Sequence, residues 1–146
     1  MKALIQRVGW SRVEVDGGEV SSTGPGMLVL LGVADPDGED DARYMASKTA
    51  SLRIFEDAEG RMNLSIRETG GEVLVVSQFT LVADTKKGNR PGFGGAAPPD
   101  RAERLYERFV QELGDLGITV KTGVFGADMA VSLLNDGPVT ILLESK

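Results

Sequence analysis

The chain has 146 residues, a formal net charge of −6, and neither cysteine nor histidine. This length predicts a single domain over residues 1–146 that buries about two thirds of the surface its unfolded chain exposes. Because the chain has no cysteine, disulfides and thiolate chemistry are excluded. Because it has no histidine, Ser-His-Asp triads are excluded and the commonest metal ligand is missing. The negative net charge argues against a protein that coats DNA or RNA.

The N-terminal residues predict a strand followed by a hairpin. Leu4–Val8 is apolar and β-branched enough for a strand. Val13 and Val15 alternate with polar residues, and Asp16–Gly18 then offers a turn into a second strand at Glu19–Ser21.

The next residues predict a buried strand and an amphipathic helix. Met27–Val33 reads as the strand, within an apolar run, Gly26–Ala34, that is far shorter than the roughly 20 residues of a membrane span. We expect no membrane segment and, because no apolar leader is present, a cytoplasmic location. Asp37 is the expected N-cap of a helix over Glu39–Leu52. The apolar face of this helix consists of Ala42, Met45, Ala46, Thr49 and Leu52.

The middle of the chain predicts two strands and a long irregular loop. Arg53–Glu56 is expected to form a short strand before a turn at Asp57–Gly60, and Glu72–Leu81 a longer one. The sixteen residues Asp84–Pro99 contain four glycines and three prolines, which excludes regular structure. Loops of this length are usually functional or disordered.

The C-terminal third predicts a second amphipathic helix, which starts at Asp100, and then strands at Ile118–Thr122, Ala130–Leu134 and Val139–Glu144. The apolar stripe of the helix consists of Ala102, Leu105, Tyr106, Phe109, Leu113 and Leu116. Because strands and helices do not alternate strictly, the fold class is α+β with two main helices, rather than a doubly wound sheet.

The common nucleotide and metal motifs are absent. The glycine-rich loop does not contain GxxxxGK[ST], and no GxGxxG follows a strand and opens a helix. The acidic cluster Asp35–Asp41 lacks the EF-hand pattern and is interpreted as a solvated helix start, because acids favour the first helical turn. We expect no metal and no cofactor.

Two groups of charged residues leave alternatives open. Asp84, Asp128 and Asp136 lie at strand ends or in loops, and two of them could form a carboxylate pair for hydrolysis, although nothing in the sequence brings any two together. A positive island on this acidic chain is interpreted either as a solvated loop, which composition alone favours, or as a docking point for one or two phosphates. It consists of Lys86, Lys87 and Arg90.

Two polar segments interrupt apolar strands. Ser77–Leu81 reads as an edge strand that leaves the core, or as a strand end that presents hydroxyl, amide and backbone N–H groups to a ligand. Asn135–Thr140 reads as an ordinary β-turn, or as a functional loop that requires a cis Gly137–Pro138 bond. Local chemistry does not decide between these interpretations.

Together, the two segments resemble the signature motifs of the D-aminoacyl-tRNA deacylases, also called D-tyrosyl-tRNA deacylases. The resemblance covers nearly the whole chain, because Ile5–Val8, Gly26–Val33, Asp84–Pro91 and Thr122–Met129 also resemble the family in order and spacing. One departure is Gly92, where the family pattern has serine, which puts a hydroxyl contact from this loop in doubt.

The resemblance implies a homodimer of barrel-like, mixed and antiparallel β-sheets with the active site at the subunit interface. It implies hydrolysis of the ester between a D-amino acid and the 3′-terminal adenosine of tRNA, with glycyl-tRNA also accepted. Neither a membrane nor DNA is an expected partner.

The resemblance also implies roles for individual residues. A cis Gly137-Pro138 pair would enter the partner subunit's pocket and exclude L-amino acids, and Arg7 would orient this pair. Ser77, Gln78 and Phe79 would seat the adenosine and the ester, and Thr80 has the position of a proposed nucleophile. The remaining implied substrate-binding residues are Phe125, Met129 and Asn135, with Lys86, Lys87 and Arg90 as candidates for the terminal phosphates.

The residues themselves favour catalysis assisted by the RNA. A threonine nucleophile needs a base, and neither a histidine nor an evident lysine or acid accompanies Thr80. An aminoacyl ester is already activated, so positioning, oxyanion donors and the neighbouring 2′-hydroxyl can suffice. The alternatives are a non-catalytic dimeric domain that binds a nucleotide-like ligand, and a carboxylate-pair hydrolase.

Overall fold

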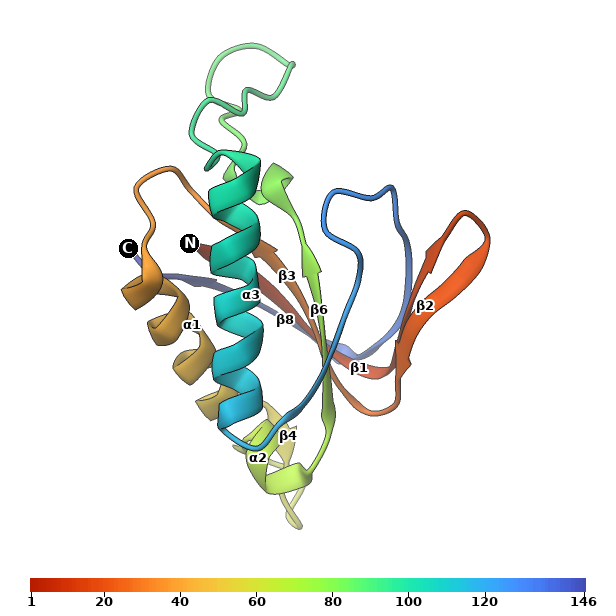
Figure 1. Cartoon of the computed structure of the whole chain (residues 1–146). Helices are drawn as coiled ribbons and strands as arrows, with labels where there is room; N and C mark the ends of the chain where they lie inside the picture. The colour runs from red at the N-terminus through yellow and green to blue at the C-terminus, as the bar shows by residue number, and fades with distance from the viewer.

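One long strand organises the sheet. The computed structural model describes residues 1–146, and its strand β1 (Lys2–Val15) pairs with β8 (Ala130–Glu144) on one edge. On the other edge, β1 pairs first with β3 (Gly26–Gly32) and then with β2 (Gly18–Thr23). Figure 1 shows β1 passing from the helix-covered part of the sheet into the hairpin with β2. The predicted hairpin is thereby confirmed.

Parallel pairing extends the sheet through its most apolar strands. β3 pairs in parallel with β6 (Glu72–Ser77), and β6 pairs in parallel with β7 (Thr119–Thr122). The valines of β6 are buried, as expected for a strand in a parallel sheet that is covered on both faces.

The two ends of the sheet approach each other. The Ser21 hydroxyl on β2 donates a hydrogen bond to the Thr122 carbonyl on β7 at 2.7 Å, and Lys121 Nζ donates to the Ser22 carbonyl, also at 2.7 Å. These side-chain bonds bring β2 against β7 without a ladder between them. The mixed sheet is therefore a nearly closed barrel, which confirms the predicted fold class.

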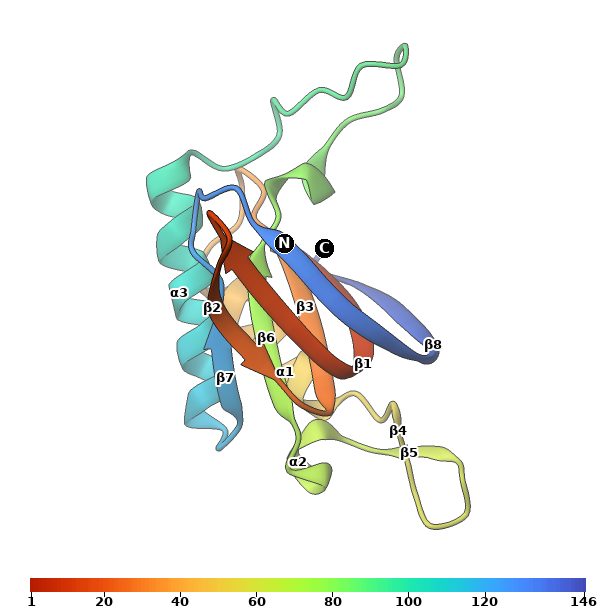
Figure 2. The same cartoon turned by 90° about the vertical axis from the view of Figure 1, so that its right-hand side faces the viewer.

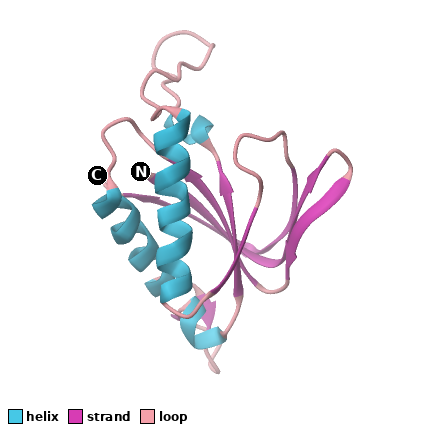
Figure 3. Ribbon diagram, in the orientation of Figure 1, coloured by secondary structure: helices cyan, strands magenta, loops and turns pink.

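Two helices cover one face of the sheet (Figure 3): α1 (Glu39–Ser51) and α3 (Pro99–Asp115). The shorter α2 (Ile66–Thr69) and the hairpin of β4 (Phe55–Glu56) with β5 (Met62–Leu64) lie between α1 and β6 in the chain. The predicted apolar faces are buried, except that Leu52 and Leu116 are only half-buried. None of the helices is both long and apolar enough to cross a membrane.

The predicted N-cap of α1 is wrong. Gly38 occupies that position, and its N–H donates to the Asp41 carboxylate at 2.9 Å. Asp37 instead lies buried against the Met1 ammonium at 2.6 Å and accepts a hydrogen bond from the Ala34 N–H. The carboxylate turns inward because a buried cation binds it more strongly than an exposed helix end would.

Three predicted boundaries are also wrong. The strand predicted over Glu72–Leu81 ends at Ser77, where the chain turns into a 3-10 helix, η1 (Phe79–Val82). The strands predicted at Ala130–Leu134 and Val139–Glu144 are one strand, β8, and Asn135–Thr140, for which the sequence left two interpretations open, contains a bulge in this strand rather than an ordinary β-turn. The helix predicted from Asp100 begins one residue earlier, at Pro99, because proline is well suited to the first helical position.

Candidate active site

The end of β6 carries the first polar segment. The Gln78 N–H donates to the Leu31 carbonyl at 2.8 Å, which fixes the chain as it leaves the sheet. β3 can approach this closely only because residue 32 is glycine, since a Cβ there would lie 2.9 Å from the Gln78 carbonyl oxygen. η1 then leaves Phe79 and Thr80 exposed, with the Gln78 amide hydrogen-bonded to the Thr80 hydroxyl.

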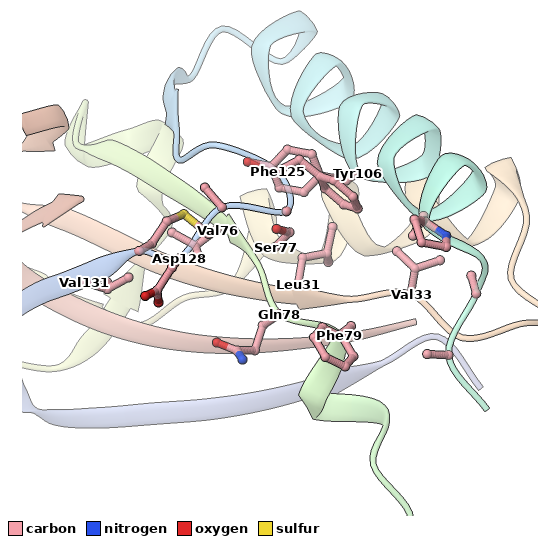
Figure 4. A pocket seen from close by; sticks show the side chains of 17 residues that line it. Leu31, Val33, Val76, Ser77, Gln78, Phe79, Tyr106, Phe125, Asp128 and Val131 are labelled. Carbon is pink, nitrogen blue, oxygen red and sulfur yellow. The ribbon is translucent and has the colours of Figure 1, made fainter. Parts of the chain in front are cut away.

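A cavity of about 500 Å³ opens beside this strand end. Its walls come from the ends of β3 and β6, the first turns of α3 and the segment 125–129, and most of its lining residues are apolar (Figure 4). Of the sequence-predicted site residues, the structure brings together five in this lining: Ser77, Gln78, Phe79, Phe125 and Met129.

Tyr106 is a cavity residue that sequence analysis assigned only to the helix core. Its hydroxyl donates to the Val75 carbonyl at 2.7 Å, and its ring centroid lies 5.9 Å from that of Phe125. Burial, with a smaller contribution from the nearby Glu107 carboxylate, raises the pKa of Tyr106 to about 12. The hydroxyl is thus neutral at ordinary pH and already hydrogen-bonded, so Tyr106 forms a flat wall of the cavity rather than acting as a catalytic base. Its helical spacing gave no signal of this role.

Only one carboxylate reaches the cavity. Asp128 lines it, whereas Asp84 lies in the exposed loop and the Asp136 carboxylate lies 3.6 Å from Arg7 Nε. The structure therefore brings no two of these acids together in the cavity, which removes the geometric basis for the carboxylate-pair hydrolase. No group of three acidic side chains is arranged to hold a metal ion.

The second polar segment forms a bulge in β8. Between the pairs Gln6↔Thr140 and Val8↔Asn135, the single residue Arg7 on β1 faces the four residues 136–139 of β8. The Gly137–Pro138 bond in this bulge is cis. Glycine is required there, since φ is +136° and a Cβ would lie 3.1 Å from the Arg7 guanidinium.

Arg7 fixes this bulge from inside the molecule. It is buried; its Nε donates to the Asp136 carbonyl at 3.0 Å, and its Nη1 donates to the Ile54 carbonyl at 2.7 Å. The Asn135 side-chain oxygen accepts the Val139 N–H at 3.3 Å. Gly137 and Pro138 themselves are exposed and line no part of the cavity. Within one chain, the two polar segments are therefore apart.

The third predicted group lies on a loop that projects from the body of the protein (Figure 2). The side chains of Lys86, Lys87 and Arg90 are exposed and form no ion pair within the chain. Backbone hydrogen bonds in both directions between Asp84 and Gly92, at 2.7 and 2.9 Å, close the base of the loop. The loop therefore presents free positive charge on an acidic protein.

Comparisons with known proteins place this architecture in a family. The model of the family described as D-Tyr-tRNA(Tyr) deacylase matches residues 4–144. The chain belongs to this family. A protein of Anaeromyxobacter dehalogenans named D-aminoacyl-tRNA deacylase is 60% identical over 100% of this chain and 98% of its own length. One of Heliobacterium modesticaldum with the same name is 58% identical over 100% of this chain and 97% of its own length.

Solved structures share the fold of this family member. A structure named c-Myc DNA Unwinding Element Binding Protein has a TM-score of 0.94 at 41% identity, covering 100% of this chain and 99% of its own. A structure described as that of a probable eukaryotic D-amino acid tRNA deacylase has a TM-score of 0.84 at 18% identity, covering 97% of each chain. With its full-length relatives named as deacylases, the protein is an enzyme of the hydrolase class.

Proposed function

We propose that this enzyme hydrolyses the ester that joins a D-amino acid to the 3′-terminal adenosine of tRNA, releasing the free amino acid and the tRNA in the cytoplasm. The observation that carries the proposal is the cavity at the end of β6. Its size suits one nucleoside, the rings of Phe125 and Tyr106 offer apolar faces to a purine, and Ser77 and Gln78 place polar groups at one edge.

The residues beside the cavity favour assistance from the RNA. Water attacks the ester carbonyl carbon, the bond from this carbon to the ribose oxygen breaks, and that oxygen takes up a proton. Thr80 lines no part of the cavity, and its hydroxyl is bonded to the Gln78 amide with neither an acid nor an amine as partner. Thr80 therefore positions Gln78, and the neighbouring 2′-hydroxyl of the substrate orients or activates the water.

A second copy of the chain completes the site. Gly137 and Pro138 lie away from the cavity of their own subunit, on a strand that also exposes Leu134 and Leu142. In the proposed homodimer, this bulge enters the mouth of the partner subunit's cavity. Because Arg7 holds its backbone, the bulge forms a fixed wall that collides with an L side chain and leaves space for a D side chain or for glycine.

The test is deacylation of D-tyrosyl-, D-aspartyl-, glycyl- and L-tyrosyl-tRNA under single-turnover conditions, with the molar mass measured by light scattering. We expect similar rates for both D-aminoacyl esters, turnover of glycine, no turnover of L-tyrosine, and a dimer. Selection of one D side chain over the other, or refusal of glycine, would show that the pocket reads the side chain. A monomer that deacylates normally would rule out the shared site.

DNA binding is the second candidate function, because the solved relative at 41% identity is named for a DNA element. The net charge of −6 opposes it, since affinity for duplex DNA depends on neutralising many phosphates. Titration of a labelled duplex at low and moderate salt separates the candidates. We expect no saturable binding, whereas tight binding that survives moderate salt would favour this function.

A further inference from the structure

Two phenylalanine rings lie exposed beside the cavity. Phe79 is 57% exposed and Phe93 is 38% exposed, and their ring centroids are 5.0 Å apart in an edge-to-face arrangement. Phe79 lines the cavity, whereas Phe93 does not, so the pair extends the apolar surface from the cavity out onto the long loop. Neighbouring exposed rings are typical of a surface that another molecule covers.

The backbone around Phe93 is fixed on both sides. The paired hydrogen bonds between Asp84 and Gly92 end directly before it, and its own carbonyl accepts the Ala96 N–H at 3.1 Å. The ring therefore lies at the base of the loop, against the cavity residue Phe79, whereas the unpaired cations Lys86, Lys87 and Arg90 precede it and lie within the loop that the Asp84–Gly92 pair closes.

This order of groups matches the order of groups along a single RNA strand. If the terminal adenosine occupies the cavity, its 5′-phosphate leaves through the mouth and the preceding nucleotide follows it outward, so the 5′-phosphate of that preceding nucleotide can reach the cations of the loop. The next base then reaches the surface that lies between the cavity and those cations. Proteins that hold single-stranded RNA combine such cationic grooves with aromatic rings on which bases stack.

We propose that Phe93, supported edge-on by Phe79, forms the stacking surface for the base of the nucleotide that precedes the terminal adenosine. This inference rests on the proposed function and extends it, since the enzyme then recognises a dinucleotide end rather than an aminoacyl-adenosine. The contact contributes to RNA binding and leaves the chemistry of the ester unchanged.

A cycle of protein and substrate changes tests the contact. Phe93→Ala and the native enzyme are compared on D-tyrosyl-tRNA, on the same tRNA with an abasic site at the penultimate nucleotide, and on D-tyrosyl-adenosine. Tyr44→Ala, which removes another exposed aromatic ring on α1, is the matched control. Phe93→Tyr keeps a stacking ring and should restore the native rates.

We expect Phe93→Ala to lower kcat/KM on the intact tRNA by about 10-fold, the effect of losing one stacked base. The abasic tRNA should lower the native rate by a similar factor, and Phe93→Ala should then add nothing. Rates on D-tyrosyl-adenosine and those of Tyr44→Ala should not change.

If Phe93→Ala and the abasic site each lowered kcat/KM by the same factor whether or not the other change was present, the stacking contact would be overturned. So would an equal loss on D-tyrosyl-adenosine, which would place Phe93 in support of the cavity, or dissociation of the dimer by Phe93→Ala, which would place it in the subunit contact. Failure of the proposed function is distinguishable from all of these, because the native enzyme would then not deacylate intact D-tyrosyl-tRNA.

Discussion

The two polar segments of this chain are held in place by different means. Ser77 is the last residue of a strand that is buried in the sheet and Gln78 follows it, so the hydrophobic core determines where they lie. Gly137 and Pro138 lie in an exposed bulge of β8, between two residues that pair with β1, and the buried Arg7 guanidinium and the Asn135 side chain bind the backbone of this bulge.

This contrast teaches which changes each segment tolerates. A segment placed by many apolar contacts resists the loss of any one of them, because no single contact dominates its position. A segment placed by a few hydrogen bonds depends strongly on each side chain that makes them. The bulge should therefore be the more fragile half of the proposed active site.

The largest expected effect follows from removing the anchor of the bulge. Arg7→Ala leaves the Asp136 and Ile54 carbonyls without this donor. We expect a loss of about 3 kcal/mol in the free energy of unfolding, measured by urea denaturation, because two carbonyl acceptors lose their donor. We also expect a fall in kcat/KM of about 100-fold or more on D-tyrosyl-tRNA, because the wall is no longer fixed. Near-native activity with unchanged selectivity for D- over L-aminoacyl-tRNA would contradict this account of the bulge.

The next prediction compares two hydroxyl groups, one on the protein and one on the RNA. Thr80→Ala removes only the bond to the Gln78 amide, so kcat/KM should fall by less than about 10-fold. A substrate ending in 2′-deoxyadenosine should react about 100-fold more slowly with the native enzyme. If Thr80→Ala is inactive while the deoxy substrate reacts normally, threonine is the nucleophile. Single-turnover rates at saturating enzyme decide this.

A smaller effect is expected from changes in the projecting loop, which belongs to neither of the two polar segments. Lys86→Ala with Lys87→Ala should weaken tRNA binding and reduce the slope of log K against log salt concentration by about 1.4, the value for two phosphate contacts on a single strand. The single-turnover rate at saturating tRNA should stay within about twofold, since exposed changes far from a reacting group rarely alter chemistry. An unchanged slope would make this a merely solvated loop.

The smallest effect concerns the wall of the cavity. Tyr106→Phe removes one hydrogen bond to the Val75 carbonyl, which still accepts the Gly123 N–H at 3.2 Å. The free energy of unfolding should therefore fall by only about 1 kcal/mol at neutral pH. Activity should remain close to native, because the flat ring that faces the cavity is kept.

The same variant has a defined dependence on pH. The folded pKa of Tyr106, about 12, lies above the ordinary value of 10.0, so its contribution to stability is complete below pH 10 and is lost as the pH rises through 12. The native protein should therefore lose stability relative to Tyr106→Phe across this interval. If the free energy of unfolding of the native protein and of Tyr106→Phe changed in parallel with pH, the Tyr106 hydroxyl would not be buried in solution.

Short-range patterns predicted most of the secondary structure. The hairpin through Asp16–Gly18, the buried strand near Met27–Val33 and both amphipathic helices follow from turn chemistry and apolar periodicity, which are local properties. The same reasoning failed at Asp37, because its partner, the Met1 ammonium, is distant in sequence. At Asn135–Thr140 local chemistry left two interpretations open, and the structure has a bulge with the cis Gly137–Pro138 bond that one of them required, because the partner strand pairs with both flanks.

The sequence by itself determined the two motifs, the α+β composition and the lack of any histidine base, since these depend on residue identity and order. Only the tertiary structure decided that Tyr106 and Phe125 form walls of one cavity, that Asp128 alone of the three candidate acids reaches it, and that the bulge of β8 does not. The physical reason is that a cavity arises where several distant segments pack incompletely. No local pattern encodes which side chains face the space they leave.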